Sequence, residues 1–362
     1  MGLRSELRRL ALSSGSAAVG MTTAAAFPDV AADMERRRRD GSSAQLGFTY
    51  TDPGTATNVA SSFPWAASII VVAHAYLPDA GTPQRRSGAA RVARFAERDH
   101  YLPLRETLDG LAVRLRADGH RAAVLCDDRR LVDRAAAVRA GVGWWGKNAM
   151  VLVPGSGPWV LLGSVVTDAD LEPDEPMARD CGNCSACLPA CPTGALVAPG
   201  LLDARRCLAA VLQGPGTIPR RLRGAVEDRL YGCDDCLDAC PPGTRLVGRS
   251  TEDRGAVDVV DILSASDAQL LREHEHFFIP GRRVRYLRRN ALVVLGNSAV
   301  TTVGASMVVG FLGHPDPLLR LHSAWAAGRI GGPLMGAALE TGWRSERAAD
   351  VRAEMALAMA GQ

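Results

Sequence analysis

The segment Cys181-Gly-Asn-Cys184-Ser-Ala-Cys187-Leu-Pro-Ala-Cys191-Pro192 contains four of the nine cysteines and decides how the chain is interpreted. Its spacing, C-x2-C-x2-C-x3-C-P, is that of bacterial ferredoxins with two [4Fe–4S] clusters, in which the fourth cysteine binds the other cluster. Gaps of two residues let three thiolates converge on one cluster, and the longer gap directs the fourth sulfur elsewhere. The sequence therefore predicts two clusters.

A second, shorter copy follows at Cys233-Asp-Asp-Cys236-Leu-Asp-Ala-Cys240-Pro241, and it is one cysteine short of the full run. Cys207 lies between the two copies and can supply the missing ligand. Eight cysteines then form two sets of four. The predicted ligands are Cys181, Cys184, Cys187 and Cys240 for one cluster, and Cys191, Cys207, Cys233 and Cys236 for the other.

Zinc is the alternative, because structural zinc sites also use four cysteines. A zinc ribbon would show paired C-x2-C knuckles without the x3-C-P ending that both copies share, so the spacing favours iron–sulfur clusters. Closely spaced cysteines in a chain of 362 residues without an export signal indicate metal ligands rather than disulfides. Because no apolar run is long enough to span a bilayer, we expect a cytoplasmic protein without membrane association.

The regions on either side of the cysteines differ in their periodicity. Residues 1–168 alternate helical and strand-like segments, which predicts an α/β or α+β domain. The expected elements are helices at 17–27, 102–117 and 131–140, strands at 68–74 and 121–127, and a hairpin of 150–153 with 159–162. For residues 169–250 we expect a ferredoxin-like double-cluster module whose fold is stabilised by its metal clusters. Residues 251–362 are helical in pattern, and His314–Arg320 resembles the start of a HEAT-like repeat.

Arginines cluster although the formal net charge is only +3. One cluster lies at the start of an expected helix, and a second lies beside the cysteine segment, as contacts to phosphates would require. The two clusters are Arg282, Arg283, Arg285, Arg288 and Arg289, and Arg220, Arg221 and Arg223. Either cluster can alternatively be a solvated surface. The run Arg36–Arg39 is better explained as a solvated helix face.

The stretch from Asp127-Asp-Arg-Arg-Leu-Val-Asp133-Arg134 to Gly143-Trp144-Trp-Gly146-Lys147-Asn148 resembles the signature of epoxyqueuosine reductases. Further blocks and the double-cluster run are similar to the same family, over about residues 60 to 330. These blocks are 91–96, 192–196, 206–207, 230–233 and 288–297. One departure is Asp99-His100-Tyr101, where the family usually has Asp-Tyr-His.

The resemblance implies a base-off cobalamin held in the first domain, next to the double-cluster module. The substrate would be epoxyqueuosine at the wobble position of a tRNA, reduced to queuosine, with electrons from a donor such as a flavodoxin or ferredoxin. Asp127 matches the proton donor of the family, a role that needs a pKa raised by burial. The resemblance also assigns the cobalamin pocket to residues at or beside Ala93, Val151, Leu162, Ala209 and Cys233.

Three functions remain open from the sequence. The first is the cobalamin-dependent reduction of epoxyqueuosine in tRNA. The second is a corrinoid iron–sulfur reductase that acts on a small molecule, such as a reductive dehalogenase relative. The third is an iron–sulfur electron carrier without enzymatic activity. Among the neighbouring residues, we expect Cys126 to be a small buried apolar residue and Asp133 and Arg134 to pair or to cap the following helix.

Overall fold

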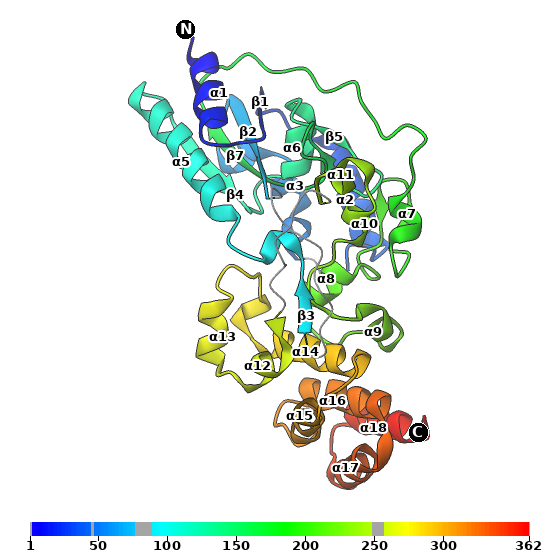
Figure 1. Ribbon diagram of the computed structural model, residues 1–362. Helices are drawn as coiled ribbons and strands as arrows, with labels where there is room; N and C mark the ends of the chain where they lie inside the picture. The colour runs from blue at the N-terminus through cyan, green and yellow to red at the C-terminus, as the bar shows by residue number, and fades with distance from the viewer. Residues whose placement is uncertain (1, 45–46, 77–88, 248–256, 362) are drawn as a thin grey trace. The chain divides into compact units, whose positions relative to one another are not determined.

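The computed structural model describes residues 2–44, 47–76, 89–247 and 257–361, and it divides into two compact units (Figure 1). The first unit comprises residues 1–81, 98–207 and 234–252, and the second comprises residues 82–97, 208–233 and 253–362. Both units are therefore discontinuous in sequence. The boundaries predicted from the sequence, at residues 168 and 250, follow the limits of the cysteine segment and not those of the compact units. This division into three domains stays a prediction.

A four-stranded antiparallel sheet forms the centre of the first unit. Its strands, in spatial order, are β1 (Ala18–Thr23), β2 (Ser68–Ala75), β7 (Val160–Thr167) and β4 (Ala122–Cys126). The two central strands pair over eight residues, from Ser68 opposite Thr167 to Ala75 opposite Val160. Residues Ile69–Val72 are fully buried, because both faces of the sheet are covered. A continuous apolar run is what such a strand shows in sequence.

Helices cover both faces of this sheet (Figure 1). They are α1 (Leu3–Ser13) and α5 (Tyr101–Ala117) on one face and α6 (Asp133–Arg139) on the other. Leu104 and Leu108 of α5 pack on Gly163 of β7. A Cβ atom on Gly163 would lie 2.6 Å from Leu108 Cδ1, so the glycine lets α5 approach the sheet closely. The result is an α+β layered domain, within the predicted class.

The remaining elements of the first unit are short. They are α2 (Pro28–Arg39), a 3-10 turn (Thr49–Thr51), α3 (Pro53–Ala56), α4 (Val59–Ser62), β5 (Trp144–Trp145), β6 (Val151–Leu152), α7 (Cys187–Ala190), β8 (Leu196–Ala198), β9 (Leu201–Leu202), α10 (Asp235–Asp238) and α11 (Pro241–Val247). The cysteine segment thus contains only one-turn and two-turn helices and a small hairpin of β8 and β9. On α2, Arg36 and Arg38 are about half exposed and pair with Asp33 and Glu35, so this face is solvated as expected.

Two predicted elements of the first unit are wrong. The segment 17–27 contains the edge strand β1 instead of a helix, since residues 18–23 pair one to one with β2. Most of this strand is buried and its residues are small, so its sequence lacks the alternation of apolar and polar residues that predicts a strand. The predicted hairpin is also absent from the described residues. Its first arm, β6, pairs with β5, while its second arm, β7, pairs along its length with β2 and along its C-terminal part with β4.

The second unit is mainly helical and contains one small sheet (Figure 1). Its elements are β3 (Ala89–Val92), a 3-10 turn (Arg94–Ala96), α8 (Leu208–Gln213), α9 (Arg220–Val226), β10 (Arg229–Tyr231), β11 (Val257–Asp258), α12 (Val259–Ser264), α13 (Asp267–Glu273), a 3-10 turn (Pro280–Arg282), α14 (Arg285–Asn297), α15 (Thr302–Leu312), α16 (Pro317–Ile330), α17 (Gly332–Ser345) and α18 (Ala349–Ala360). The helical pattern predicted for residues 251–362 is confirmed.

The core of the second unit is one apolar cluster that extends from β3 and α8 to α18. The start of α14 adds a buried polar network to it. The Arg289 guanidinium donates to the carbonyls of Val211, Leu212, Gly214 and Gly216, and the Asn290 amide donates to Leu212 and Leu230. Buried carbonyls that end helices need such donors, so α14 fixes the loop after α8.

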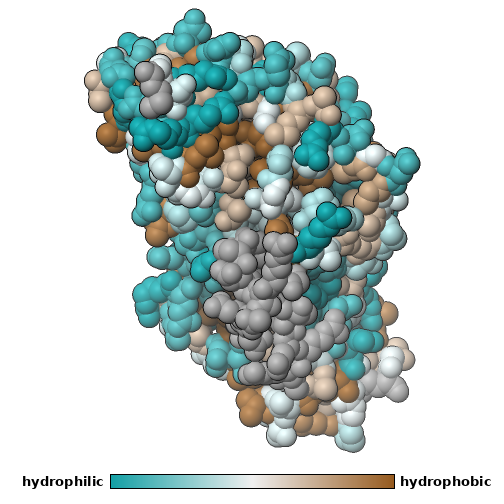
Figure 2. Space-filling model, turned by 45° about the horizontal axis from the view of Figure 1, so that its top comes forward, coloured by the Kyte–Doolittle hydropathy of each residue, from teal (hydrophilic) through white to brown (hydrophobic). Residues whose placement is uncertain are grey.

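Hydrophilic side chains cover much of the face shown in Figure 2, and hydrophobic ones gather in separate patches. The large exposed hydrophobic side chains, which include Leu102, Val113 and Phe278, are likewise scattered over several elements. Among the described helices, none combines the length and the apolar composition that crossing a membrane requires.

Candidate functional site

Four cysteines line one small cavity in the first unit. Cys181, Cys184 and Cys187 come from the first cysteine run and Cys240 from the end of the second, and the other lining residues are Lys147, Asn148, Leu152 and Pro241. These four are the cysteines predicted to hold one cluster. The structure thus brings together residues more than 50 positions apart in the chain, and the one-turn helices α7 and α10, which contact each other, position the two runs.

The cysteines of this cavity differ in exposure. Cys187 and Cys240 are buried, at 8% exposed each, whereas Cys184 is exposed. Burial, followed by the neighbouring cysteines, raises the pKa of Cys187, and burial raises the pKa of Cys240 to about 11. A thiol in such surroundings becomes a thiolate when it binds a positively charged metal centre. The donor set, four cysteine sulfurs around one cavity, fits a [4Fe–4S] cluster.

The second predicted ligand set is described in two parts. Cys191, Cys207 and Cys236 belong to the first unit and Cys233 to the second. The Cys191 sulfur accepts a hydrogen bond from the Ala195 amide at 3.1 Å. Burial works to raise the pKa of Cys191, but amide donors including Leu196, Thr193 and Ala195 outweigh it and lower the pKa. Hydrogen bonds to sulfur are one of the factors that tune iron–sulfur clusters, so Cys191 suits a ligand.

Asp127 follows directly on β4 and has a strained backbone. Cys126, the last residue of β4, is opposite Gly163 of β7, so the main chain of Asp127 continues this register toward Leu162. The φ angle of Asp127 is +52°, in the left-handed region that residues other than glycine rarely adopt. Such strain gathers at functional sites. Val151 and Leu162 pack in the apolar cluster that also contains Leu125 of β4.

Acidic groups gather around Asp127, and their pKa values are raised. Surrounding protein atoms raise the pKa of Asp127 by desolvation, although the residue remains accessible to solvent; Arg105 lowers this pKa and Asp128 raises it. Burial, followed by the charge of Asp127, raises the pKa of Asp133 well above its usual value. The same two causes raise the pKa of the Tyr101 phenol. This arrangement can hold and deliver protons near neutral pH.

Two expectations for the neighbours of Asp127 need correction. Cys126 is half-buried rather than a fully buried apolar residue, and burial raises the pKa of its thiol to about 12. Asp133 and Arg134 form no pair among the described contacts. The Asp133 Oδ1 atom is buried without a hydrogen-bond partner in the described structure, and Arg134 donates to the Ala149 carbonyl at 3.3 Å.

The sequence did not single out Tyr101 as part of this site. Helix α5 and strand β4 run antiparallel and are joined by a short turn, so the start of α5 lies beside the end of β4. Asp99 caps this start by accepting from the amides of Tyr101 and Leu102 at 2.9 and 3.2 Å. The departure Asp99-His100-Tyr101 therefore lies at the site, and pairing α5 with β4 would have located it.

Two of the three second-unit residues assigned to cobalamin are neighbours. The Ala93 amide donates to the Tyr231 carbonyl at 2.8 Å. Gly232, with a φ angle of +72°, leads into Cys233, and a Cβ atom there would lie 2.5 Å from Ala93 Cβ. Glycine thus allows these two chain segments to lie in close contact. Ala209 is half-buried on α8, a helix that contacts β10.

The arginine clusters are only partly available to bind nucleic acid. Arg289 is fully buried in the carbonyl network described above, and Arg223, 2% exposed, donates to Ile218 and pairs with Glu354. These two cannot contact phosphates, so their predicted role is wrong. Arg285 and Arg288 pair with Asp316 and Asp267. Exposed members without an ion-pair partner among the described residues are Arg221, Arg282 and Arg283.

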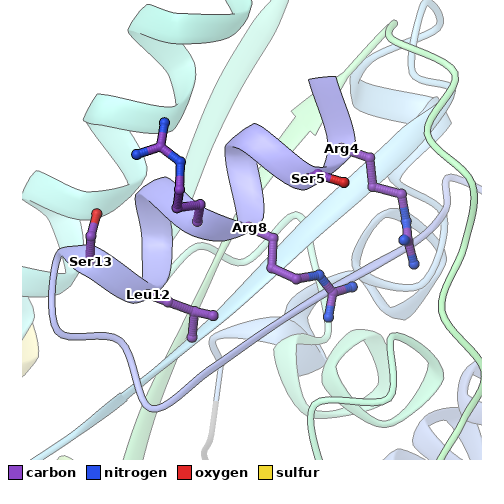
Figure 3. Close-up of a pocket in the computed structure, with 6 residues that line it drawn as sticks. Arg4, Ser5, Arg8, Leu12 and Ser13 are labelled. Atoms are coloured by element: carbon purple, nitrogen blue, oxygen red, sulfur yellow. The ribbon is translucent and has the colours of Figure 1, made fainter. Parts of the chain in front are cut away.

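A larger surface hollow lies along α1 (Figure 3). Its lining residues are Arg4, Ser5, Arg8, Arg9, Leu12 and Ser13. Arg4 and Arg8 each approach Asp174 at 2.6 Å, so their charges are partly neutralised. Asp174 also accepts from the Met21 amide at 2.8 Å. These contacts hold α1 and β1 to the segment before the cysteines, which is a structural role.

Comparison with known proteins agrees with the two sequence motifs. Residues 180–243 match the model of the 4Fe-4S double cluster binding domain, and residues 283–360 match the model of HEAT repeats. The first match decides between iron–sulfur clusters and zinc in favour of clusters. The second extends the single HEAT-like unit seen in the sequence over helices α14 to α18.

Relatives of the full length are epoxyqueuosine reductases. The chain is 32% identical to the epoxyqueuosine reductase of Bacillus cereus (strain ATCC 14579), over 86% of this chain and 85% of the relative. It is also 32% identical to that of Bacillus subtilis (strain 168), over 98% of this chain and 94% of the relative. The chain belongs to the epoxyqueuosine reductase family. It is an oxidoreductase by this membership.

Solved epoxyqueuosine reductases have the same fold. A crystal structure of one with an epoxyqueuosine-modified stem loop of tRNA-Tyr has a TM-score of 0.90 and 30% identity, and covers 99% of this chain and 98% of that chain. The Bacillus subtilis enzyme with its catalytic Asp loop swung out of the active site has a TM-score of 0.89, 30% identity and the same coverage. The fold expected from the resemblance is thus confirmed for its iron–sulfur and HEAT-like parts.

Proposed function

We propose that this protein reduces epoxyqueuosine to queuosine in the anticodon region of tRNA. The reaction removes the epoxide oxygen as water and consumes two electrons and two protons. The observation that carries the proposal is the strained Asp127, which lies at the end of β4 and whose pKa is raised by desolvation. A relative of the same fold has a catalytic Asp on a movable loop, which supports the same role for Asp127.

Asp127 is the proton donor in this proposal. Desolvation raises the pKa of Asp127, so a larger fraction of the carboxyl is protonated near neutral pH than is usual for aspartate. Asp133 and Tyr101 lie close to Asp127, since the charge of Asp127 contributes to raising the pKa of both groups. The positive φ angle directs the chain away from the strand, which exposes the Asp127 carboxyl to a substrate.

Two clusters would supply the electrons, one held by Cys181, Cys184, Cys187 and Cys240 and the other by Cys191, Cys207, Cys233 and Cys236. We infer that base-off cobalamin would be held beside Asp127 by the main chains at Val151 and Leu162, whose side chains pack in an apolar core cluster of the first unit. Cobalamin supplies a redox-active cobalt for cleaving carbon–oxygen bonds. Ala93, Ala209 and Cys233 are assigned to the same cofactor, and the close contact of Ala93 with the segment before Cys233 supports a shared role.

The tRNA is bound through its phosphates and its anticodon loop. The solved relative contains a modified tRNA stem loop, and the exposed guanidinium groups of Arg221 and Arg283, which have no ion-pair partner among the described residues, suit phosphate oxygens. A splayed base in a loop is the usual target of specific RNA recognition. An electron donor such as a flavodoxin or ferredoxin completes the proposed system.

Anaerobic reconstitution with iron, sulfide and cobalamin, followed by a reductant and an epoxyqueuosine-containing tRNA stem loop, tests this function. Digestion and mass spectrometry should show that the modified nucleoside loses one oxygen and becomes queuosine. Bound corrinoid without loss of the epoxide would favour a reductase of another substrate. Failure to retain corrinoid, with both clusters present, would favour an electron carrier.

A further inference from the structure

The motif Gly143-Trp144-Trp-Gly146-Lys147-Asn148 has no role in the proposed reaction at Asp127. Lys147 and Asn148 line the cavity of Cys181, Cys184, Cys187 and Cys240. Both residues belong to the first unit, as do the four cysteines. We propose that Lys147 and Asn148 set the reduction potential of the cluster in this cavity by donating hydrogen bonds and positive charge to its sulfur atoms.

Asn148 provides a buried donor that the protein leaves unused. The residue is 5% exposed, and its Oδ1 atom accepts from the Met150 amide at 3.1 Å. This bond fixes which end of the amide is the donor. The Nδ2 atom is buried and has no hydrogen-bond partner among the described residues. An unsatisfied buried donor costs about 1–3 kcal/mol, so a partner is expected in the cavity, where sulfur atoms are the available acceptors.

Lys147 brings the only ammonium group of the chain to the same cavity. All other residues among the 42 lysines and arginines are arginines. The Lys147 Nζ atom donates to the Gly182 carbonyl at 2.6 Å, within the loop between Cys181 and Cys184. A compact ammonium places its charge at one point, whereas a guanidinium requires a wider planar space. The charge is thus anchored at the cysteine loop.

Two further groups, Trp144 and Asp180, lie near the cavity. The buried Nε1 atom of Trp144 also has no partner in the described structure, and the Trp144 ring packs with Cys240 and Cys181. Asp180 accepts from the Gly182 amide at 2.6 Å and is exposed. It brings an opposing negative charge, but it does not line the cavity.

The charge of the cluster gives the expected direction of the change in reduction potential. A [4Fe–4S] cluster with four thiolate ligands becomes more negative by one unit when it takes up an electron. Hydrogen bonds to the sulfurs and nearby cations stabilise the reduced state and raise the reduction potential. Removing either group should therefore make the cluster harder to reduce. This inference rests on the cluster ligands and is independent of the tRNA reaction.

The test is a redox titration of the reconstituted full chain, monitored by electron paramagnetic resonance, without tRNA or corrinoid. In Lys147→Met and in Asn148→Leu, one of the two one-electron steps should shift to lower potential. The expected change is about tenfold in the equilibrium constant for reduction, or about 59 mV. The other step should not move. Lys147→Arg should shift that step by less than Lys147→Met does.

Matched controls are Asn183→Leu, an exposed amide in the same cysteine loop, and Arg9→Met, which removes one positive charge at α1. Unchanged potentials in both Lys147 and Asn148 variants with full iron and sulfide content would overturn the proposal. So would equal shifts in the controls. If Asn148→Leu assembles no cluster, Asn148→Asp, which keeps the shape and replaces the donor by an acceptor, should lower the potential further than the loss of the donor predicts.

Discussion

The Asp127 region of the first unit and the start of α14 in the second unit both bury charged side chains, but they treat these groups in opposite ways. Around Arg289, six donor contacts reach main-chain carbonyls and the Asn290 side chain. Around Asp127, the neighbouring Asp133 has a buried oxygen without a partner. The hydrogen-bonded guanidinium of Arg289 stabilises the fold. The carboxyl groups near Asp127, which are not all hydrogen-bonded, are available for chemistry.

The sharpest test of this difference is Asp127→Asn. If Asp127 donates a proton, the variant should bind its cofactors and lose about 10²–10⁴-fold in turnover of the modified stem loop. The matched control is Asp128→Asn, because Asp128 is the adjacent carboxyl and pairs with Arg130 at 2.5 Å. Single-turnover measurements under anaerobic conditions compare the two. Equal losses in the two variants would contradict a specific role of Asp127.

At the start of α14, the hydrogen bonds of Arg289 predict a large effect of its substitution on stability. Arg289→Met removes the donor from four buried carbonyls and should lower the free energy of unfolding by about 3 kcal/mol or more. Arg329→Met, at an exposed position on α16, is the control and should change it little. Chemical denaturation followed by circular dichroism measures both. A variant as stable as the wild type would show that water can replace the guanidinium.

Asp133 should make stability depend on pH in a specific direction. Its folded-state pKa is raised above the unfolded value, so the folded state holds the proton more tightly. The stability contribution of this proton is present at low pH and is lost as pH rises through the folded pKa. Asp133→Asn should therefore gain stability relative to the wild type at pH 8 and less at pH 5. Thermal unfolding tests this, with exposed Asp109→Asn as the control.

The exposed arginines should give the smallest effect. Arg221→Gln and Arg283→Gln each remove one possible phosphate contact, so each should weaken stem-loop binding only several-fold and reduce the salt slope by about one. Arg344→Gln, on exposed α17 and paired with Glu340, should leave both unchanged. Binding measured at several salt concentrations decides whether this surface contacts the RNA.

Local patterns were predicted well and distant contacts were not. The cysteine spacing is a local pattern, so the sequence alone indicated the two clusters, while Cys207 as a ligand stays a prediction. Helices such as α5 and α14 also followed from their periodicity. The partners of β7 depend on residues about 40 to 90 positions away, and a local hairpin was the simpler prediction.

The arginines and the acidic site show the same limit. Arg289 is buried because it donates to carbonyls more than 70 residues earlier in the chain. No local sequence pattern reveals these contacts. Asp127 was identified from a resemblance, whereas its strain and its protonated neighbours follow from how α5, β4 and α6 pack. Lys147 and Asn148 reach the cysteines only through the folding of the first unit.

The central claim, that Asp127 delivers the proton, is tested most directly by the pH dependence of a single turnover. The account predicts that the rate falls as pH rises through a pKa above the usual range of aspartate, because deprotonated Asp127 cannot donate. In Asp127→Asn the residual rate should lack this step. The same step in the variant, or a wild-type rate that does not change over this range, would contradict the account.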